Sequence, residues 1–262
     1  MSTRAQEYAA EVLRREQLSP HLVRLVLGGD GLSAFASTGI PDEWVGLVVP
    51  GQFQSRYYTV RSWDGSELVL DVVVHDVGLV TEWATRDCVG DRVTITQPKG
   101  SFALPEDAAW LLLVGDVTAL PAMARIAEEH AHDVPTRIHA EVPDLPEQLD
   151  GYLPHTADIT WLTPDSATGA STLAAVVEAM EWPEGDGYFW MAGESAQMRA
   201  IRKHVMRDRK LPSSRYDVMG YWRSVDARRP RRVDPGPIWR AGKAAGKSDA
   251  EIWADYDEAA DR

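Results

Sequence analysis

The segment Ser55–Arg61, with the sequence SRYYTVR, places two arginines, two tyrosines and a threonine in a predicted β-strand. Tyr and Thr favour strands, and the alternation of a strand sends Arg56 and Tyr58 to one face and Thr59 and Arg61 to the other. A strand that only fills a sandwich has no need of cations on both faces. The segment therefore predicts a strand that holds a ligand. An ordinary edge strand whose arginines extend to solvent is the alternative.

Length and composition describe a globular protein. The chain has 262 residues, 44% apolar and 26% charged, which is enough for one large or two ordinary domains. Its longest apolar runs are far shorter than a bilayer span, and the N-terminus lacks the apolar segment of a signal peptide. We therefore expect a cytoplasmic protein.

Cysteine, histidine and charge content exclude several functional classes. The single cysteine, Cys88, rules out an internal disulfide and a cysteine-ligated iron–sulfur cluster, so redox chemistry would need another cofactor. No histidine pair has metal-ligand spacing beside a carboxylate, which argues against a metal enzyme. The net charge of −13 argues against nucleic-acid binding, because phosphate recognition needs a basic face.

The first hundred residues contain closely spaced short strands separated by turn residues. The strands are expected over residues 7–16, 21–29, 53–64, 67–76 and 91–102, with a glycine-containing connection over 30–46 and a helix over 80–87. This pattern predicts an antiparallel sandwich or barrel.

After Pro105 the pattern changes to buried strands alternating with amphipathic helices. Strands are expected over residues 109–116, 136–142, 158–163, 187–194 and 216–222, and helices over 119–131, 171–182 and 195–209. The alternation predicts a parallel sheet with helices on its faces. Ligands of such sheets bind at the carboxyl ends of strands, here the segments 114–121 and 191–198.

A third region follows residue 223. The segment 224–239 is a connector rich in proline and arginine, and Ser248 and Glu251 form a capping box before a helix expected over 249–261. Residues 223–247 hold eight basic and two acidic residues, whereas residues 249–262 hold six acidic and one basic. A solvated linker with an acidic helix and a functional basic patch both remain open.

Arg56, Tyr58 and Thr59 form the pattern R-x-Y-[TS], which resembles the flavin-binding signature of the ferredoxin-reductase-like superfamily. Each residue type suits part of such a ligand. A guanidinium pairs two-pronged with a pyrophosphate, a tyrosine ring covers a face of the isoalloxazine, and a threonine hydroxyl hydrogen-bonds near its reactive nitrogen.

A second segment, HDVGLVTEWA, begins about twenty residues later. Gly78 provides a turn and Thr81 stands at the start of the predicted helix, whose free N–H groups and positive dipole end suit a phosphate. The alternative is an ordinary helix cap, because Thr often caps helices that bind nothing.

The order of the motifs identifies a narrower resemblance. The segments SRYYTVR, VVVHDVGLVTEWA, GDRVTITQPKGSF, LLLVGDVTALPAMARI, EVPD, WMAGESAQMRAIRKHV and GYWR follow one another across residues 6–223. Together they resemble the siderophore-interacting protein family of FAD-containing ferric-siderophore reductases. The resemblance implies a six-stranded antiparallel FAD-binding β-barrel over residues 1–105 and a parallel-sheet, NAD(P)H-reductase-like α/β domain over 106–223. Residues 224–262 would add the basic linker and the C-terminal helix.

The resemblance also implies the cofactor-binding residues. They are Arg56, Tyr58 and Thr59 at the flavin diphosphate, ring and ring edge; His75, Gly78, Val80, Thr81 and Trp83 in a second flavin segment; Asp116, Thr118 and Ala119 at a strand-to-helix turn; and Tyr221 and Trp222 on the far side. Two departures from the family pattern weaken this transfer. Val117 stands where relatives often have Glu, and residues 78–81 read GLVT where they commonly read GPAS.

The donor and the acceptor follow from the same resemblance. The acceptor is a ferric siderophore, and the flavin carries the chemistry, so no catalytic acid, base or nucleophile is expected. The segment VGDVTALP has a single glycine and an acid at the helix mouth, which suits a dinucleotide poorly. The C-terminal extension resembles a ferredoxin-preferring subgroup, and the basic segment 228–247 would suit an acidic partner. We therefore expect ferredoxin as the preferred donor, with NAD(P)H as the alternative.

Lys99, Arg223 and Lys243 are candidate cations beside the acceptor, although each also fits an ordinary surface residue. Two other functions remain open for the whole chain: a non-catalytic siderophore- or flavin-binding protein, and a general NAD(P)H flavin reductase.

Overall fold

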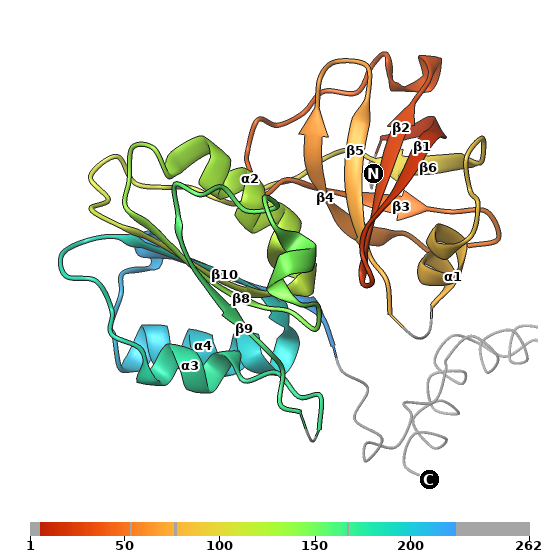
Figure 1. Ribbon diagram of the computed structural model, residues 1–262. Coiled ribbons are helices and arrows are strands. Elements are labelled where there is room, and N and C mark those ends of the chain that lie inside the picture. Colours follow the sequence, from red (N-terminus) through yellow and green to blue (C-terminus); the bar gives the residue numbers. More distant parts are fainter. Residues whose placement is uncertain (1–5, 53, 76–77, 167, 224–262) are drawn as a thin grey trace, which may run out of the picture. The chain divides into compact units, whose positions relative to one another are not determined.

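Six antiparallel strands of the first half close into a barrel (Figure 1). In this computed structural model, which describes residues 6–52, 54–75, 78–166 and 168–223, the strands pair in the order β1-β2-β5-β4-β3-β6, and β6 returns to β1. The strands are β1 (Glu7–Ser19), β2 (Leu22–Gly28), β3 (Trp44–Val48), β4 (Arg56–Trp63), β5 (Leu68–Val73) and β6 (Arg92–Thr96). The six-stranded antiparallel barrel implied by the family resemblance is confirmed.

Alternate side chains of these strands fill the barrel. Val12, Leu25, Val45, Val60 and Leu70 are fully buried in one cluster. Helix α1 (Leu79–Thr85) lies between β5 and β6 and adds its own buried side chains to that cluster. A short 3₁₀ turn, Asp30–Leu32, precedes β3.

Strand β3 corrects the expectation of a connection over residues 30–46. The strand begins at Trp44, inside that range, and runs through Gly46. A glycine within a strand usually weakens it. Here a Cβ at Gly46 would lie 2.9 Å from the Cβ of Ser55 and 3.1 Å from the methyl of Thr96, so close approach of the neighbouring strands requires the glycine.

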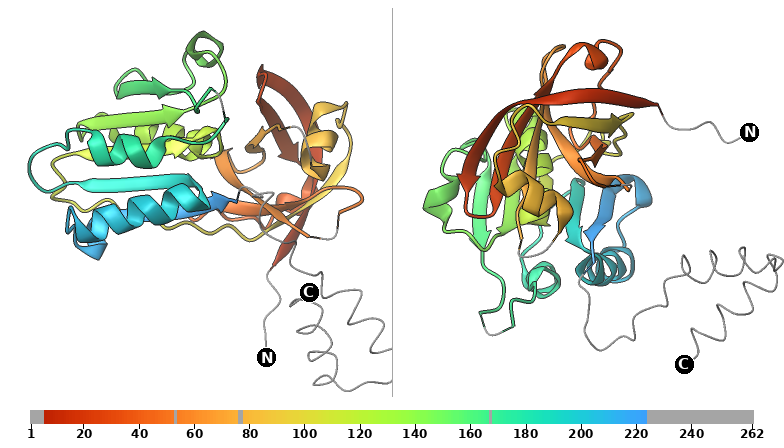
Figure 2. Two further views of the ribbon diagram at one scale, coloured as in Figure 1. Left: turned by 90° about the horizontal axis from the view of Figure 1, so that it is seen from below. Right: turned by 90° about the vertical axis from the view of Figure 1, so that its right-hand side faces the viewer.

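The second half is a five-stranded parallel sheet in the order β11-β10-β7-β8-β9. Its strands are β7 (Leu111–Asp116), β8 (Thr136–Glu141), β9 (Asp158–Leu162), β10 (Tyr188–Glu194) and β11 (Tyr216–Trp222). Helix α2 (Leu120–His130) packs on one face, and α3 (Leu173–Ala179) and α4 (Ser195–Arg207) pack on the other. Helix α4 lies against β10 and β11 (Figure 2). The parallel α/β arrangement predicted from the alternating pattern is confirmed.

The crossover from β8 to β9 contains no α-helix. Residues 142–157 form turns and one 3₁₀ turn, Pro146–Leu149. Parallel strands are usually joined by a helix that covers the sheet. Without one, Ile159 and Trp161 of β9 stay only partly buried.

A buried carboxylate, Asp42, joins the barrel to the sheet. Asp42 is 0% exposed and accepts hydrogen bonds from the backbone N–H groups of Ser101 and Phe102, at 2.9 and 3.0 Å. It also accepts bonds from the Ser101 hydroxyl at 3.1 Å and from Nε1 of Trp190 in β10 at 3.3 Å. Hydrogen-bond donors from the segment after β6 and from β10 of the sheet therefore share one carboxylate.

Glu43 makes a second connection, to helix α2. Its carboxylate accepts from the hydroxyls of Ser37 and Thr38 and from the Arg125 guanidinium, which also donates to the carbonyl of Val60 in β4. Burial alone would raise the pKa of Glu43, but these hydrogen bonds outweigh it and lower the pKa.

Asp71 of β5 makes a third connection. It pairs two-pronged with Arg24 at 2.8 Å and accepts a 2.6 Å hydrogen bond from the Tyr152 hydroxyl of the β8–β9 crossover. Arg61 of β4 lies 3.9 Å from the same carboxylate and donates to Glu128 of α2. One of the cations in SRYYTVR therefore attaches the strand to α2.

None of the helices in the described ranges is long and apolar enough to cross a membrane. The expected C-terminal helix and basic linker lie outside the described residues.

Replacing Asp42 by Ala should lower the free energy of unfolding by about 3 kcal/mol, because donors of Ser101, Phe102 and Trp190 lose their shared buried acceptor. Urea unfolding of the full chain measures the change. Asp133→Ala, at an exposed position, is the matched control and should shift stability by less than about 0.5 kcal/mol. Equal effects of the two substitutions would contradict the role given to Asp42.

Candidate functional site

The two arginines of strand β4, near its two ends, have different surroundings. Arg56 opens the strand and is exposed, and within the described ranges it forms no hydrogen bond or ion pair. Arg61, at the other end, is paired with Glu128. Arg56 thus keeps its donors available for a ligand.

Tyr58 supplies a neutral, half-buried ring beside that free cation. It packs against the barrel core. Burial raises the pKa of Tyr58 to about 12, and the Arg56 charge acts weakly in the opposite direction. The phenol therefore stays protonated at neutral pH and offers an aromatic surface.

Thr59 faces the second half of the molecule. It is 5% exposed and lies beside the hydroxyl of Tyr221 in β11, although that contact falls short of hydrogen-bond geometry. Burial raises the pKa of Tyr221, and its hydroxyl has no partner in the described part of the chain. A buried polar group without a partner is uncommon and often marks a place where a bound molecule completes the hydrogen bonding.

The first turn of helix α1 is open to an acceptor. Its N-cap is Gly78, at φ +147°, and no side chain within the described ranges caps the helix. Thr81 is the third residue of the helix, so it is not the N-cap residue that the alternative interpretation requires. Its hydroxyl oxygen lies 3.5 Å from the backbone N of His75. The carboxylate of the first turn, Glu82, is exposed. Uncapped N–H groups at such a turn suit an anion.

Val80 and Trp83 of the same helix point into the barrel core. They are 5% and 3% exposed, and Nε1 of Trp83 donates to Asp91 at 2.7 Å. Ala119 is likewise fully buried. The side chain of Ala119 fits against Gly115, where a Cβ would lie 2.4 Å away. These three residues could meet a ligand only through their backbone.

Asp116 organises the carboxyl end of the sheet. One oxygen accepts from the N–H and hydroxyl of Thr118, at 2.9 and 2.5 Å. The other accepts from the N–H of Glu194 at 3.0 Å and from Nε1 of Trp222 at 2.7 Å. Burial raises the pKa of Asp116, and the hydrogen bonds act in the opposite direction. Asp116 is therefore the N-cap of the turn Val117–Ala119.

Two further carboxylates end strands at the same edge. Glu141 of β8 accepts from the N–H and hydroxyl of Thr172, at 2.7 and 2.8 Å. Glu194 of β10 accepts from the N–H groups of Ala196 and Gln197 and so caps α4. The turn after β7 and the start of α4 are therefore each capped by a carboxylate.

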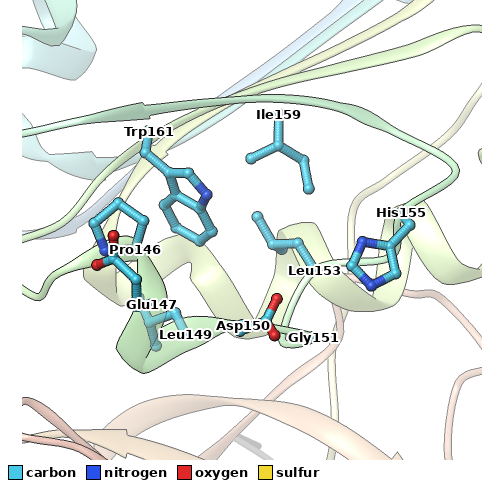
Figure 3. Close-up of a pocket in the computed structure, with 9 residues that line it drawn as sticks. All are labelled: Pro146, Glu147, Leu149, Asp150, Gly151, Leu153, His155, Ile159 and Trp161. Carbon is cyan, nitrogen blue, oxygen red and sulfur yellow. The ribbon is translucent and has the colours of Figure 1, made fainter.

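A pocket of about 340 Å³ lies elsewhere, between β9 and the helix-free crossover (Figure 3). Trp161 and Ile159 point toward Leu153, and the carboxylates of Glu147 and Asp150 line its rim. The pocket follows from the missing crossover helix. Its acidic rim disfavours a diphosphate, and none of the predicted site residues lines it.

Two family models cover most of this chain. The siderophore-interacting FAD-binding domain matches residues 11–56 and 51–102, and the siderophore-interacting protein model matches residues 108–225. The chain belongs to the siderophore-interacting protein family. The two matched regions correspond to the barrel and to the parallel sheet.

Relatives and solved structures of this family resemble the chain along nearly its full length. An NADPH-dependent ferric-chelate reductase from Escherichia coli is 29% identical over 235 residues, covering 80% of this chain and 91% of the relative. A ferric vibriobactin reductase from Vibrio cholerae is 25% identical over 241 residues, covering 81% and 88%. A siderophore utilization protein from T. fusca superposes with a TM-score of 0.73 at 29% identity, covering 87% of this chain and 97% of the other.

FAD is the cofactor of the barrel domain in this family, and the residues of the chain fit it. Arg56, the first turn of α1 and the Tyr221 hydroxyl offer donors that have no side-chain partner among the residues that the structure describes. Tyr58 offers an aromatic surface. These features suit a diphosphate attached to a flat ring system.

The structure groups the thirteen predicted site residues only in part. Trp222 of β11 is hydrogen-bonded to Asp116 of β7. The neighbouring Tyr221 has its hydroxyl beside Thr59 of β4. His75, Gly78 and Thr81 form a separate group at α1. The assignment of these residues to FAD remains a prediction. Sequence reasoning missed Gly193, where a Cβ would lie 2.6 Å from Asp116 Oδ2; its place near the carboxyl end of a buried strand was the available signal.

Arg56→Ala should weaken FAD retention by about 2–3 kcal/mol, because a charge-assisted contact to the diphosphate is lost. The measurement is flavin occupancy, from the visible spectrum, after extensive dialysis. Arg92→Ala removes another exposed arginine of the barrel and should leave occupancy unchanged. Full occupancy in the Arg56 variant would refute the assignment of this arginine.

Proposed function

We propose that the chain is a FAD-dependent ferric-siderophore reductase. The observation that carries the proposal is an unpaired arginine beside a half-buried tyrosine on a strand of the family's FAD-binding barrel. The names of the Escherichia coli and Vibrio cholerae relatives support the substrate class.

In this proposal, the release of iron depends on its oxidation state. Siderophores bind ferric iron through hard donor atoms, and the softer ferrous ion fits such ligands less well. When bound, FAD accepts electrons in pairs or singly and delivers them one at a time. One electron added to the chelate is therefore a release step that forms and breaks no covalent bond to the protein.

The residues of this chain would bind and orient rather than transfer groups. Arg56 and the first turn of α1 would hold the diphosphate, Tyr58 would cover the ring, and Thr59 with Tyr221 would meet its edge. Asp116 would not serve as a catalytic base, because both of its oxygens already accept hydrogen bonds. This arrangement agrees with chemistry that needs no acid–base pair.

For the electron donor we propose a nicotinamide nucleotide, supported by the relative named as NADPH-dependent. The sequence-based expectation of ferredoxin rests on residues 224–262, which lie outside the described residues, and no relative supports that preference. Ferredoxin therefore remains the alternative. The cytoplasmic location expected from the sequence belongs to the same proposal.

The reductase function predicts that the purified protein is yellow, and that its photoreduced flavin is reoxidised anaerobically by a ferric siderophore. The measurement is the recovery of flavin absorbance at about 450 nm, with the iron-free siderophore as control. Siderophore binding without reoxidation would favour a non-catalytic carrier. A colourless protein that takes up no added FAD would refute the proposal.

The donor proposal predicts that NADPH or NADH bleaches the flavin band anaerobically in the absence of ferredoxin. Stopped-flow absorbance compares both nucleotides with reduced ferredoxin on the full chain. Bleaching by ferredoxin alone would refute the nucleotide proposal and favour the alternative. Rapid reduction of small dyes with no preference for ferric chelates would identify a general flavin reductase.

A further inference from the structure

The helix-free crossover from β8 to β9 leaves a pocket on the α2 side of the sheet. In most parallel sheets a crossover helix covers each pair of neighbouring strands. Here residues 142–157 join the two strands through turns, and the pocket of about 340 Å³ lies between them and β9 (Figure 3). This volume is at the lower end of the range for small-molecule sites, so it suits a ligand of one or two rings rather than a dinucleotide.

The crossover that forms one wall of this pocket is fixed to the barrel at two points. The side chain of Asp144 is fully buried, accepts a hydrogen bond from the Ser19 hydroxyl at 2.9 Å and lies 2.7 Å from Nδ1 of His21. Eight residues later, the Tyr152 hydroxyl donates to Asp71 of β5 at 2.6 Å. The wall is therefore preorganised, which lowers the entropic cost of binding a ligand.

The interior of the pocket is apolar. Leu149 and Leu153 of the crossover are buried, and Ile159 and Trp161 of β9 face them across the pocket (Figure 3). Because no helix covers β9 on this side, both of its side chains stay only partly buried. A ligand with an apolar body would remove these surfaces from water.

The charges at the rim of the pocket are negative. Glu147 and Asp150 place exposed carboxylates there, and neither is paired with a cation in the part of the chain that the structure describes. The nine residues that line the pocket include no Lys or Arg, and His155 is the one base among them. The rim therefore attracts a cation and repels an anion.

Two arginines lie nearby but do not cancel this charge. Arg24 and Arg61 line a second hollow, between the crossover and the barrel, which Asp150 also borders. Arg24 pairs with Asp71, and Arg61 pairs with Glu128. Their charges are already compensated by other carboxylates.

We propose that this pocket binds a small organic cation, in which an ammonium group is carried by an apolar body of one or two rings. The side chains of Leu149, Leu153 and Trp161 would enclose the body. The carboxylates of Glu147 and Asp150 would receive the ammonium group. The site is separate from the residues assigned to FAD, and the inference does not rest on the proposed function.

Three probes of nearly equal size test the charge selection on the FAD-loaded full chain: phenethylamine, 2-phenylethanol and phenylacetate. Calorimetry measures their dissociation constants. At low salt we expect the amine to bind about fivefold more tightly than the alcohol, because the two differ only in the charged group, and we expect no binding of phenylacetate. The preference for the amine should shrink at high salt, since exposed carboxylates are screened.

The double variant Glu147→Gln/Asp150→Asn tests the location of the site. It should weaken the amine to the affinity of the alcohol and leave the alcohol unchanged. Glu178→Gln/Glu181→Gln is the matched control, because it removes two exposed carboxylates in or next to α3, on the other side of the sheet, and should leave the preference intact. Trp161→Leu should weaken the amine and the alcohol alike, by about fivefold, because it removes apolar contact but no charge.

Equal affinities of the amine and the alcohol at low salt would overturn the proposal. So would a preference that survives in Glu147→Gln/Asp150→Asn, or no binding of either probe at concentrations up to about 10 mM. FAD content and reoxidation by a ferric siderophore are measured on the same samples. A failure of those two measurements counts against the reductase function alone, and a failure of the probes counts against the cation site alone.

Discussion

Buried carboxylates need partners from more than one segment of this chain, and the rest of the structure depends on that requirement. A carboxylate removed from water is costly unless hydrogen bonds or cations replace its hydration. Asp42 and Asp71 belong to the barrel, yet Trp190 and Tyr152, which donate to them, come from the second half. Each carboxylate is satisfied only when both halves are in place. Part of the net charge of −13 therefore lies at junctions rather than on the surface.

The same requirement explains the strand SRYYTVR. Its last arginine pairs with Glu128 and approaches Asp71, so that end of β4 is fixed to helix α2 and to β5. Its first arginine has no partner among the described residues. One strand thus combines a structural cation and a free one. The two arginines of this strand therefore have different surroundings. Of the two, only Arg56 has no partner among the described residues and is available to an anionic ligand.

The sequence predicted the barrel and the parallel sheet because periodicity is a local property. Strand β3 escaped detection because Gly46 reads as a loop residue, and the contact with Ser55 that demands a glycine is visible only after the strands have paired. The hydrogen bond that Asp116 accepts from Thr118 is also local, because the two residues are two positions apart. Its bond to Trp222 joins residues 106 positions apart, and no periodicity indicates such a pair.

The carboxyl edge of the sheet poses a specific problem for a nucleotide donor. In many dinucleotide-binding proteins, free N–H groups at a helix N-terminus receive the pyrophosphate. Here Glu194 already accepts from the first N–H groups of α4, and Asp116 occupies the turn before α2. A diphosphate could use neither terminus without displacing a carboxylate that is held by backbone hydrogen bonds.

Helix α1 belongs to the barrel, and like α2 and α3 it has no hydrogen bond from an N-cap side chain among the described residues. The proposal that the diphosphate of FAD binds at α1 therefore also depends on Arg56 and on the family's FAD-binding barrel domain. A nucleotide at the sheet would bind mainly through its uncharged rings. A site of that kind depends on which aromatic surfaces are accessible.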